Sequence, residues 1–374
     1  MLFSGFRYAF VIFTVDMHKK KLLIISFLLV FSILVHIYSA NSIHVENQYS
    51  AVIYPKISLI LRFLTGWVPF SIGDILYGAA TLWLIWVIFY GLFKLITGKI
   101  TKESIKKGLL KTIIIALSVY LIFNIFWGIN YDREGIAYQL KLTKQEYTAV
   151  ELRHLDSLLL QKVNESKLAL VHNNSAGKKT KEIFAESNEA YKIIAAKFPF
   201  LNYKVNSVKS SMWGWIGNYF GFTGYYDPFT GEAQVNTTVP YFLQPYTTCH
   251  EMAHQLGYAK EDEANFVGYL AASASTDTLF HYSVYLDIFL ATNRNLFNVD
   301  SASARTFAKQ ISPEVKADLK TWKEFIIQHK NPAEPIVQWL YGKYLEKNNQ
   351  PSGILSYDEV TALLIAYYKN YGKI

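Results

Sequence analysis

Three apolar runs near the N-terminus constrain the fold of this chain most strongly. They cover residues 22–38, 75–96 and 109–129, and each is close to the length of about 20 residues that a helix needs to cross a bilayer. The hydrophobic content of 51% and the aromatic content of 16% are high for a soluble enzyme. We therefore expect a membrane domain over residues 1–130, with about three transmembrane helices, and a folded domain over residues 131–374.

The distribution of basic residues predicts how these helices are oriented. Lys19, Lys20 and Lys21 precede the first run, and the loop between the second and third runs carries Lys99, Lys102, Lys106 and Lys107. Short basic loops stay in the cytoplasm. The chain is then a multi-pass protein of the inner (cytoplasmic) membrane, and residues 131–374 lie in the periplasm.

The same distribution argues against nucleic-acid binding. Residues 1–130 carry 12 Lys+Arg against 4 Asp+Glu, which accounts for the whole net charge of +8, whereas residues 131–374 carry 25 of each sign. The excess of positive charge therefore belongs to the apolar part, where it sets topology and does not form a phosphate-binding face. We expect the lipid bilayer as a partner and no nucleic acid.

Two N-terminal segments allow other interpretations. The first apolar run could be a cleaved signal peptide, which would leave the orientation unchanged. Residues 1–16 are short for a span, and Met17 followed by "HKKK" makes a cleaner start than Met1. Residues 52–70 are interrupted by two prolines and two basic residues, a pattern typical of an interfacial or re-entrant segment.

The remainder of the chain predicts an α+β domain that is mainly helical. Apolar residues recur every three or four positions over residues 148–170 and 182–198, with a polar loop at 172–180. Residues 211–246 are rich in glycine, aromatic and β-branched residues, which favours turns and a small antiparallel sheet. Within them "GEAQVNTTVP" (231–240) alternates in polarity and predicts a half-buried strand. Helices return after residue 247.

The stretch "HEMAH" (250–254) carries the clearest chemical signal. Residues four apart on a helix lie on one face, so His250 and His254 can bind one metal ion. Neutral imidazole suits Zn²⁺, and a catalytic zinc has three protein ligands and one open position. Glu251 is placed to act as a general base on water at that position. Gly257 predicts the end of the helix.

The third ligand must come from further along the chain. Lys260 stands where the pattern HExxHxxGxxH has its third histidine, and an ammonium group cannot bind a metal ion. The acids Glu261, Asp262 and Glu263 follow and can open a second helix, where they would also favour the helix dipole without binding a metal. Cys249 is the only cysteine, which excludes an intrachain disulfide and a thiolate cage, and we expect it to be a small buried residue.

"HEMAH" followed by "EDEAN" (261–265) resembles the gluzincin pattern of HExxH with a downstream ExxA[ND], found in membrane peptidases of the HtpX type. The resemblance implies a zincin-like metallopeptidase in which Glu261 is the third ligand. It also implies that Ala264 lets two helices pack closely and that Asn265 orients a ligand. This chain departs from the pattern in a shorter spacing from His254 to Glu261 and in Asn for the usual Asp, so Glu263 stays an alternative ligand.

The longer stretch 224–271 resembles the DUF3810 family of bacterial membrane proteins, common in Bacteroidetes, whose members share the three-span N-terminus. The likeness covers nearly the whole chain. Zincins place a free edge strand just before the HExxH helix to bind an extended peptide, which implies a substrate-binding role for Gln234 and Asn236. His281 and Tyr282 are candidates for a donor that stabilises the tetrahedral oxyanion.

The sequence therefore predicts a membrane-anchored zinc metalloendopeptidase that acts on a peptide or protein substrate of the cell envelope. The alternative is a catalytically inactive scaffold or signalling protein with a structural metal site. Glu251 favours the enzyme, because a structural zinc has no use for a base and is normally closed by a fourth ligand. Neither the substrate nor the oligomeric state is predicted.

Overall fold

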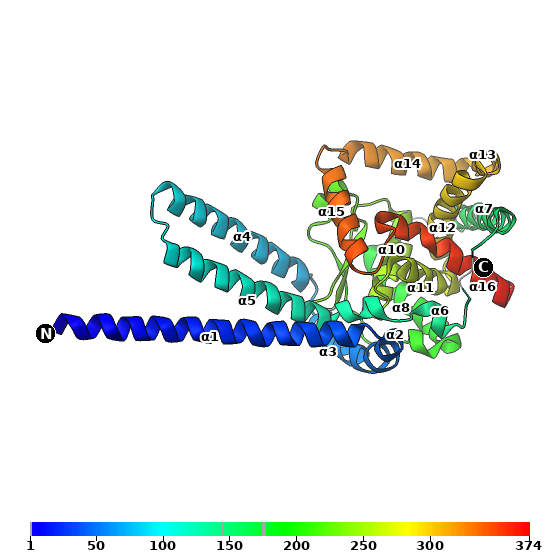
Figure 1. The fold of residues 1–374 in the computed structure, drawn as a ribbon. Coiled ribbons are helices and arrows are strands. Elements are labelled where there is room, and N and C mark those ends of the chain that lie inside the picture. Colours follow the sequence, from blue (N-terminus) through cyan, green and yellow to red (C-terminus); the bar gives the residue numbers. More distant parts are fainter. Residues whose placement is uncertain (1, 144–145, 174–176) are drawn as a thin grey trace.

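Three long helices extend from a compact C-terminal part, as Figure 1 shows for the computed structural model. The structure describes residues 2–143, 146–173 and 177–374, with side chains from His18 onward. The long helices are α1 (Leu2–Ser39), α4 (Ile72–Ile96) and α5 (Lys102–Phe126). By length and composition, three helical segments can cross a membrane: His18–Ser39 of α1, and the whole of α4 and of α5.

The third helix differs from the predicted span of 109–129, because it begins at Lys102 and ends at Phe126. Trp127, which falls within the predicted span, is only 3% exposed and lies inside the protein. At the other end of the helices, His18 Nε2 lies 2.8 Å from Glu103 Oε1. This contact brings the two basic segments of the sequence to the same end of the bundle, as the predicted topology requires.

The segment between the first two spans lies on the C-terminal part. It comprises α2 (Ser42–His44), the π-helical η1 (Val45–Ile53) and α3 (Tyr54–Gly66). One face of α3 is buried and carries Tyr54, Ser58 and Arg62, whereas the opposite face exposes Phe63, and Trp67 beyond the helix end is also exposed. Such a division of polarity fits the interfacial interpretation of residues 52–70.

The sheet is mixed and not antiparallel as predicted. It contains β1 (Val208–Ser210), β2 (Gly224–Asp227) and β3 (Glu232–Val235) in the order β1-β3-β2. β3 pairs in parallel with β1 and antiparallel with β2. The central strand β3 is fully buried, where we expected a half-buried strand. The reason is that the start of α4 covers its polar face: the Glu232 carboxylate accepts hydrogen bonds from the backbone N–H groups of Ile72 and Gly73.

Helices make up most of the C-terminal part. The longer ones are α7 (Ala149–His172), α8 (Thr180–Lys197), α10 (Gln244–Gln255), α11 (Glu261–Ala274), α12 (Thr278–Val299), α13 (Ser301–Gln310), α14 (Pro313–His329), α15 (Glu334–Lys347) and α16 (Val360–Tyr371). The short ones are η2 (Gly128–Asp132), α6 (Ile136–Gln139), η3 (Pro199–Leu201), α9 (Gly214–Gly217), η4 (Asn218–Phe220), η5 (Tyr241–Leu243) and η6 (Gly353–Glu359). The helices predicted at 148–170 and 182–198 are confirmed, while residues 174–176 of the predicted loop lie outside the described residues.

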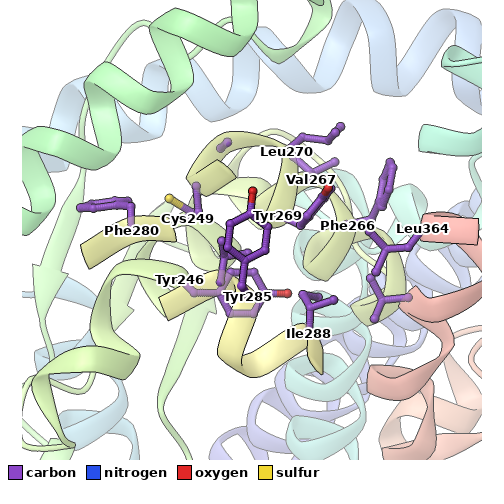
Figure 2. Packing of buried hydrophobic residues seen from close by; sticks show 14 of the residues in the cluster. Tyr246, Cys249, Phe266, Val267, Tyr269, Leu270, Phe280, Tyr285, Ile288 and Leu364 are labelled. Carbon is purple, nitrogen blue, oxygen red and sulfur yellow. The ribbon is translucent and has the colours of Figure 1, made fainter. Parts of the chain in front are cut away.

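The core of this part is built around α10, α11 and α12. Figure 2 shows Cys249 of α10 close to side chains of α11 and α12, with Leu364 of α16 at one side. Cys249 is a free, fully buried thiol, as expected from its small apolar side chain. The compact packing of these helices sets the positions of the candidate metal ligands described next.

Candidate metal centre

Helix α10 brings two histidines together. The Nε2 atoms of His250 and His254 lie 3.1 Å apart, and both side chains are buried. The helix stops just beyond them, because Gly257 adopts a left-handed conformation with φ of +92°. A Cβ atom at this position would also lie 2.8 Å from the Tyr54 ring. Glycine therefore allows both the turn and the close approach of α3.

The turn fixes the orientation of one histidine. The chain doubles back after Gly257, and His254 Nδ1 lies 2.7 Å from the carbonyl oxygen of Tyr258. A carbonyl only accepts hydrogen bonds, so Nδ1 is the nitrogen that carries the hydrogen. This leaves the lone pair of His254 Nε2 pointing towards His250, which is the arrangement found in metal-binding histidines.

Glu261, the first residue of α11, completes the cluster. Its Oε2 atom lies 3.3 Å from His250 Nε2 and 3.5 Å from His254 Nε2. Ligand atoms held about 2.0–2.1 Å from a tetrahedral zinc ion are about 3.3–3.4 Å from one another. The three atoms thus form a triangle of the right size. Glu261 Oε2 is also buried without a hydrogen-bond partner, so these residues fit a zinc ion.

The other acids of "EDEAN" face elsewhere. A Cβ atom on Gly135 would overlap the Glu263 carboxylate, which places this side chain against the loop before α6 and away from the histidines. Among the described residues, the cluster of potential metal ligands at this place contains Glu261 and not Glu263. Asn265 does not contact Glu261 in any hydrogen bond of the structure; its Nδ2 donates to the carbonyl oxygen of Tyr357 at 3.0 Å.

Glu251 lies beside the cluster and is almost completely buried. Its Oε2 atom has no hydrogen-bond partner, and a Cβ atom at Gly224 would lie 2.6 Å from its Oε1. The first residue of β2 must therefore be glycine for the strand to pass this carboxylate. Burial raises the pKa of Glu251 to about 7, although His250 and His254 act in the opposite direction. A carboxyl group poised near neutral pH suits proton transfer.

The cluster also perturbs the groups within it. Burial by itself raises the pKa of Glu261, but His254 and His250 outweigh this effect and hold that pKa below its ordinary value. Burial likewise lowers the pKa of His254, yet the neighbouring Glu261 carboxylate dominates and raises it to about 9. The Glu261 carboxylate and the His254 imidazole thus stabilise each other's charged forms in a place where charge is otherwise costly, and a zinc ion would take the place of the proton on His254 Nε2.

Tyrosines from the C-terminal helices close the site. The Tyr341 hydroxyl on α15 donates to Glu261 Oε1 at 2.9 Å and lies 3.2 Å from the Tyr357 hydroxyl. The Tyr357 ring, on η6, stacks on His250 with ring centroids 6.2 Å apart. The sequence analysis missed both residues. They lie about 80–100 positions beyond the motif, and no pattern in a single sequence connects them to it.

Two cavities that share lining residues lie beside the cluster. One cavity of about 310 Å³ is lined by residues 221–224, Thr247 and Arg294, and one of about 140 Å³ by Trp127 and Tyr226; His250, Glu251 and Tyr341 line both. Beside these cavities lies β2, an edge strand of the sheet, which pairs with β3 along one side only. Among the described residues no strand pairs with its other edge, and Gly224, the first residue of β2, lies against Glu251.

The remaining predicted site residues are not brought to the cluster. Gln234 and Asn236 belong to and follow the central strand β3, whose two edges are both paired, so the prediction of a free edge there was wrong. His281 Nε2 contacts the Ser275 carbonyl oxygen, and the Tyr282 hydroxyl donates to Asp318 Oδ2 at 2.6 Å. Among the described residues of α12, Asp287 and Arg294 line one of the two cavities beside His250, and neither His281 nor Tyr282 lines either cavity.

Helix α11 packs very closely on α10. We expected Ala264 to permit this, and it is fully buried. Gly268 also permits a close contact, because a Cβ atom there would lie 3.0 Å from the backbone nitrogen of His250. A glycine in the middle of a helix costs stability, and this cost was a signal in the sequence that the position has a packing role.

Comparison with known proteins gives one match. The family model described as "Protein of unknown function (DUF3810)" matches residues 49–365, which is most of the chain. No curated protein and no solved structure matches the chain. The match spans the α3 segment, two of the three membrane-length helices and the whole candidate metal centre.

Proposed function

The chain belongs to the DUF3810 family, and for this member we propose that it is a membrane-anchored zinc metallopeptidase of the zincin-like type. The observation that carries the proposal is the triangle of His250 Nε2, His254 Nε2 and Glu261 Oε2, with edges of 3.1, 3.3 and 3.5 Å. The buried carboxylate of Glu251 beside it supports a catalytic site over a purely structural one, because a structural zinc has no use for a base.

In the proposed reaction, His250, His254 and Glu261 hold a zinc ion, and Tyr341 keeps Glu261 in place through its second oxygen. A bound zinc ion supplies Lewis acidity to the scissile carbonyl and to a water molecule. Glu251 would accept a proton from that water as its oxygen bonds to the scissile carbonyl carbon, and would give the proton to the amine that leaves when the C–N bond breaks. The free edge of β2 binds the substrate backbone as an added strand, which favours a peptide with little sequence preference.

The location we propose is the periplasmic face of the inner membrane. His18, which directly precedes the basic residues Lys19, Lys20 and Lys21, contacts Glu103 in the first turn of α5. The connection between α4 and α5 lies at the end of these two helices far from the C-terminal part (Figure 1). Positively charged loops of this length favour the cytoplasmic side. The metal centre then faces the cell envelope, where its substrates are peptides or proteins.

The decisive experiment uses the full-length protein in detergent, because α3 and η1 form part of the fold around α10. Wild type, Glu251→Gln, Glu261→Gln and Glu263→Gln are compared for bound zinc and for casein cleavage. We expect Glu251→Gln to retain zinc and to lose about 10²–10⁴ of the rate, the usual contribution of a general base.

We expect Glu261→Gln to lose zinc while the matched variant Glu263→Gln keeps it. Equal cleavage by wild type and Glu251→Gln, with zinc retained, would sink the peptidase proposal and favour the scaffold with a structural metal. Zinc lost from Glu263→Gln alone would move the third ligand to Glu263.

A further inference from the structure

A cavity of about 340 Å³ lies at the C-terminal end of α10, separate from the cavities of the metal centre. It is bounded by α3 on one side and by residues 200–204 on the other. Four of its lining residues are cationic: Lys56, Arg62, Arg133 and Lys204. No aspartate or glutamate lines it among the residues that the structure describes.

In the described part of the chain, only one of these four cations forms an ion pair with a carboxylate. Arg133 forms a buried, two-pronged ion pair with Glu46, with N–O distances of 2.7 and 2.8 Å. Arg62 is just 4% exposed, yet its guanidinium donates to the carbonyl oxygens of Val205 and Ser58 and stacks on Tyr203, and none of these partners carries a negative charge at neutral pH.

No carboxylate forms an ion pair with Arg62, Lys56 or Lys204 anywhere in the described part of the chain. A buried charge is costly unless a counter-charge accompanies it. This cost applies to Arg62, which is buried, whereas Lys56 and Lys204 are exposed. A buried cation without a carboxylate partner, with two exposed cations beside the same cavity, indicates a site for an anion of more than one negative oxygen.

The surroundings of the cavity indicate where that anion comes from. Leu59 and Phe200 expose apolar side chains beside the cations. The outward face of α3 continues this apolar surface through Phe63, and Trp67 beyond the helix is 80% exposed. The chain then enters the membrane-length helix α4 five residues later. An amphiphilic ligand with a phosphate group fits both the charges and the apolar rim.

We propose that this cavity binds the phosphate of an anionic phospholipid headgroup. Arg62 is the buried donor at its base, and Lys56 and Lys204 are the exposed cations at its mouth. The cavity adjoins the turn after α10: Tyr258 lines it, and Arg133 donates to the carbonyl oxygen of Gly257 at 3.0 Å. Headgroup binding is therefore expected to stabilise the turn whose Tyr258 carbonyl orients His254, whether or not the protein is a peptidase.

The test uses the full-length protein in a neutral detergent and the exposed lysines, so that folding is not at risk. Lys56→Gln/Lys204→Gln is compared with the matched variant Lys181→Gln/Lys323→Gln, which removes the same charge from exposed lysines on α8 and α14. Native mass spectrometry counts bound phosphatidylglycerol and phosphatidylcholine, and a thermal melt reports stabilisation.

We expect wild type and the matched variant to retain one phosphatidylglycerol that phosphatidylcholine does not replace. The cavity variant should bind it roughly tenfold more weakly or worse, as the loss of two lysines near a phosphate implies, and lose the accompanying rise in melting temperature. Inorganic phosphate is the second arm, and it should bind far more weakly because it lacks acyl chains.

Two outcomes would overturn the assignment. If the cavity variant binds phosphatidylglycerol as wild type does, the cavity is not the lipid site. If inorganic phosphate binds wild type as tightly as phosphatidylglycerol and is lost in the cavity variant, the anion is free phosphate and the lipid assignment is wrong.

Discussion

Tyr341 reaches the candidate metal centre from a helix 80 residues away in sequence and holds one oxygen of Glu261. Groups that orient a metal ligand in this way typically contribute 10–100-fold to metal affinity. We predict that Tyr341→Phe weakens zinc binding by about this factor, as measured by competition with a zinc chelator, because the Glu261 carboxylate loses its fixed orientation.

The control for this variant lies one turn further along α15. Tyr344→Phe removes a hydroxyl that contacts Tyr131 at 3.1 Å and not Glu261. Its zinc affinity should equal that of wild type. Equal affinities for wild type and Tyr341→Phe would mean that the hydrogen bond to Glu261 has no role in holding the metal.

For single residues, the sequence predicted correctly which side chains share one face of a helix. His250, Glu251 and His254 share one helix, so their proximity depends on local geometry. Glu261 was expected from the resemblance to gluzincins, with Glu263 as the alternative, and the packing of α11 on α10 places Glu261 beside the histidines. Tyr341 and Tyr357 could not be predicted, because their proximity depends on how α15 and η6 fold back over α10. His281 and Tyr282 were predicted as donors to an oxyanion, but they do not lie at the cluster. Helical spacing does not reveal which face of α12 meets the site, because that also depends on how distant segments pack.

Among the elements, the pair α10 and α11 determines the geometry of the ligands. Gly268 of α11 lies against the backbone of His250, and backbone atoms cannot move aside as a flexible side chain can. We predict that Gly268→Ala separates the two helices, destabilises the protein by about 1–3 kcal/mol, and weakens zinc binding because Glu261 retreats from the histidines. Thermal melts with and without zinc measure both effects.

The matched substitution is Gly108→Ala in α5, where an added Cβ atom meets nothing within 4 Å. Alanine favours a helix over glycine, so this variant should be as stable as wild type or more stable. A Gly268→Ala protein with unchanged stability would show that the two helices tolerate a wider spacing.

Helices α7 and α12 enclose a buried carboxyl group, that of Asp156. Burial raises its pKa to about 7, and a hydrogen bond from Asn293 Nδ2 at 2.8 Å offsets this only in part. The pKa of Asp156 in the folded protein lies above its ordinary value of 3.8, so the unfolded chain loses this proton at a lower pH than the folded protein does. The contribution of Asp156 to stability is therefore full below about pH 3.8 and is lost as the pH rises towards 7. We predict that Asp156→Asn gains in melting temperature relative to wild type between about pH 5 and pH 8.

Asp300→Asn provides the comparison for this pH dependence. Hydrogen bonds from Ser303 lower the pKa of Asp300 to about 2, so its charge does not change between about pH 5 and pH 8. The difference in melting temperature between this variant and wild type should stay constant over that range. A constant difference for Asp156→Asn as well would contradict a raised pKa at Asp156.

In the whole molecule, the metal centre lies next to the ends of the membrane-length helices. Trp127 directly follows the last residue of α5, and its ring centroid is 5.8 Å from that of His254. If the protein is a peptidase, bonds near the membrane surface are the ones it reaches most readily. We predict that, in proteoliposomes, a lipid-anchored peptide is cleaved fastest with a short spacer, and that the rate falls as the spacer lengthens because the effective concentration declines.

The same peptide without an anchor, at equal total concentration, serves as the control and should be cleaved more slowly. Equal rates for anchored and free peptides would show that the site takes its substrates from solution, and would leave the peptidase proposal itself intact.

The sequence by itself determined the features that depend on local patterns. Three membrane-length helices follow from runs of apolar residues, and the helices at 148–170 and 182–198 follow from a repeat of three to four. The proximity of His250 and His254 follows from one helix, and the end of that helix from Gly257, whereas the sequence left Glu261 and Glu263 as alternative third ligands. Each of these depends on residues that are neighbours along the chain.

Tertiary structure decided the features that join distant segments. It placed β3 between β1 and β2 in a mixed sheet and covered the polar face of β3 with the start of α4. It also buried Trp127 beside His254 and placed the Tyr341 hydroxyl on Glu261. It also gathered Lys56, Arg62 and Lys204 around one cavity. The physical reason is that periodicity records which face of an element is apolar, whereas the choice of the element that covers this face depends on packing across the whole molecule.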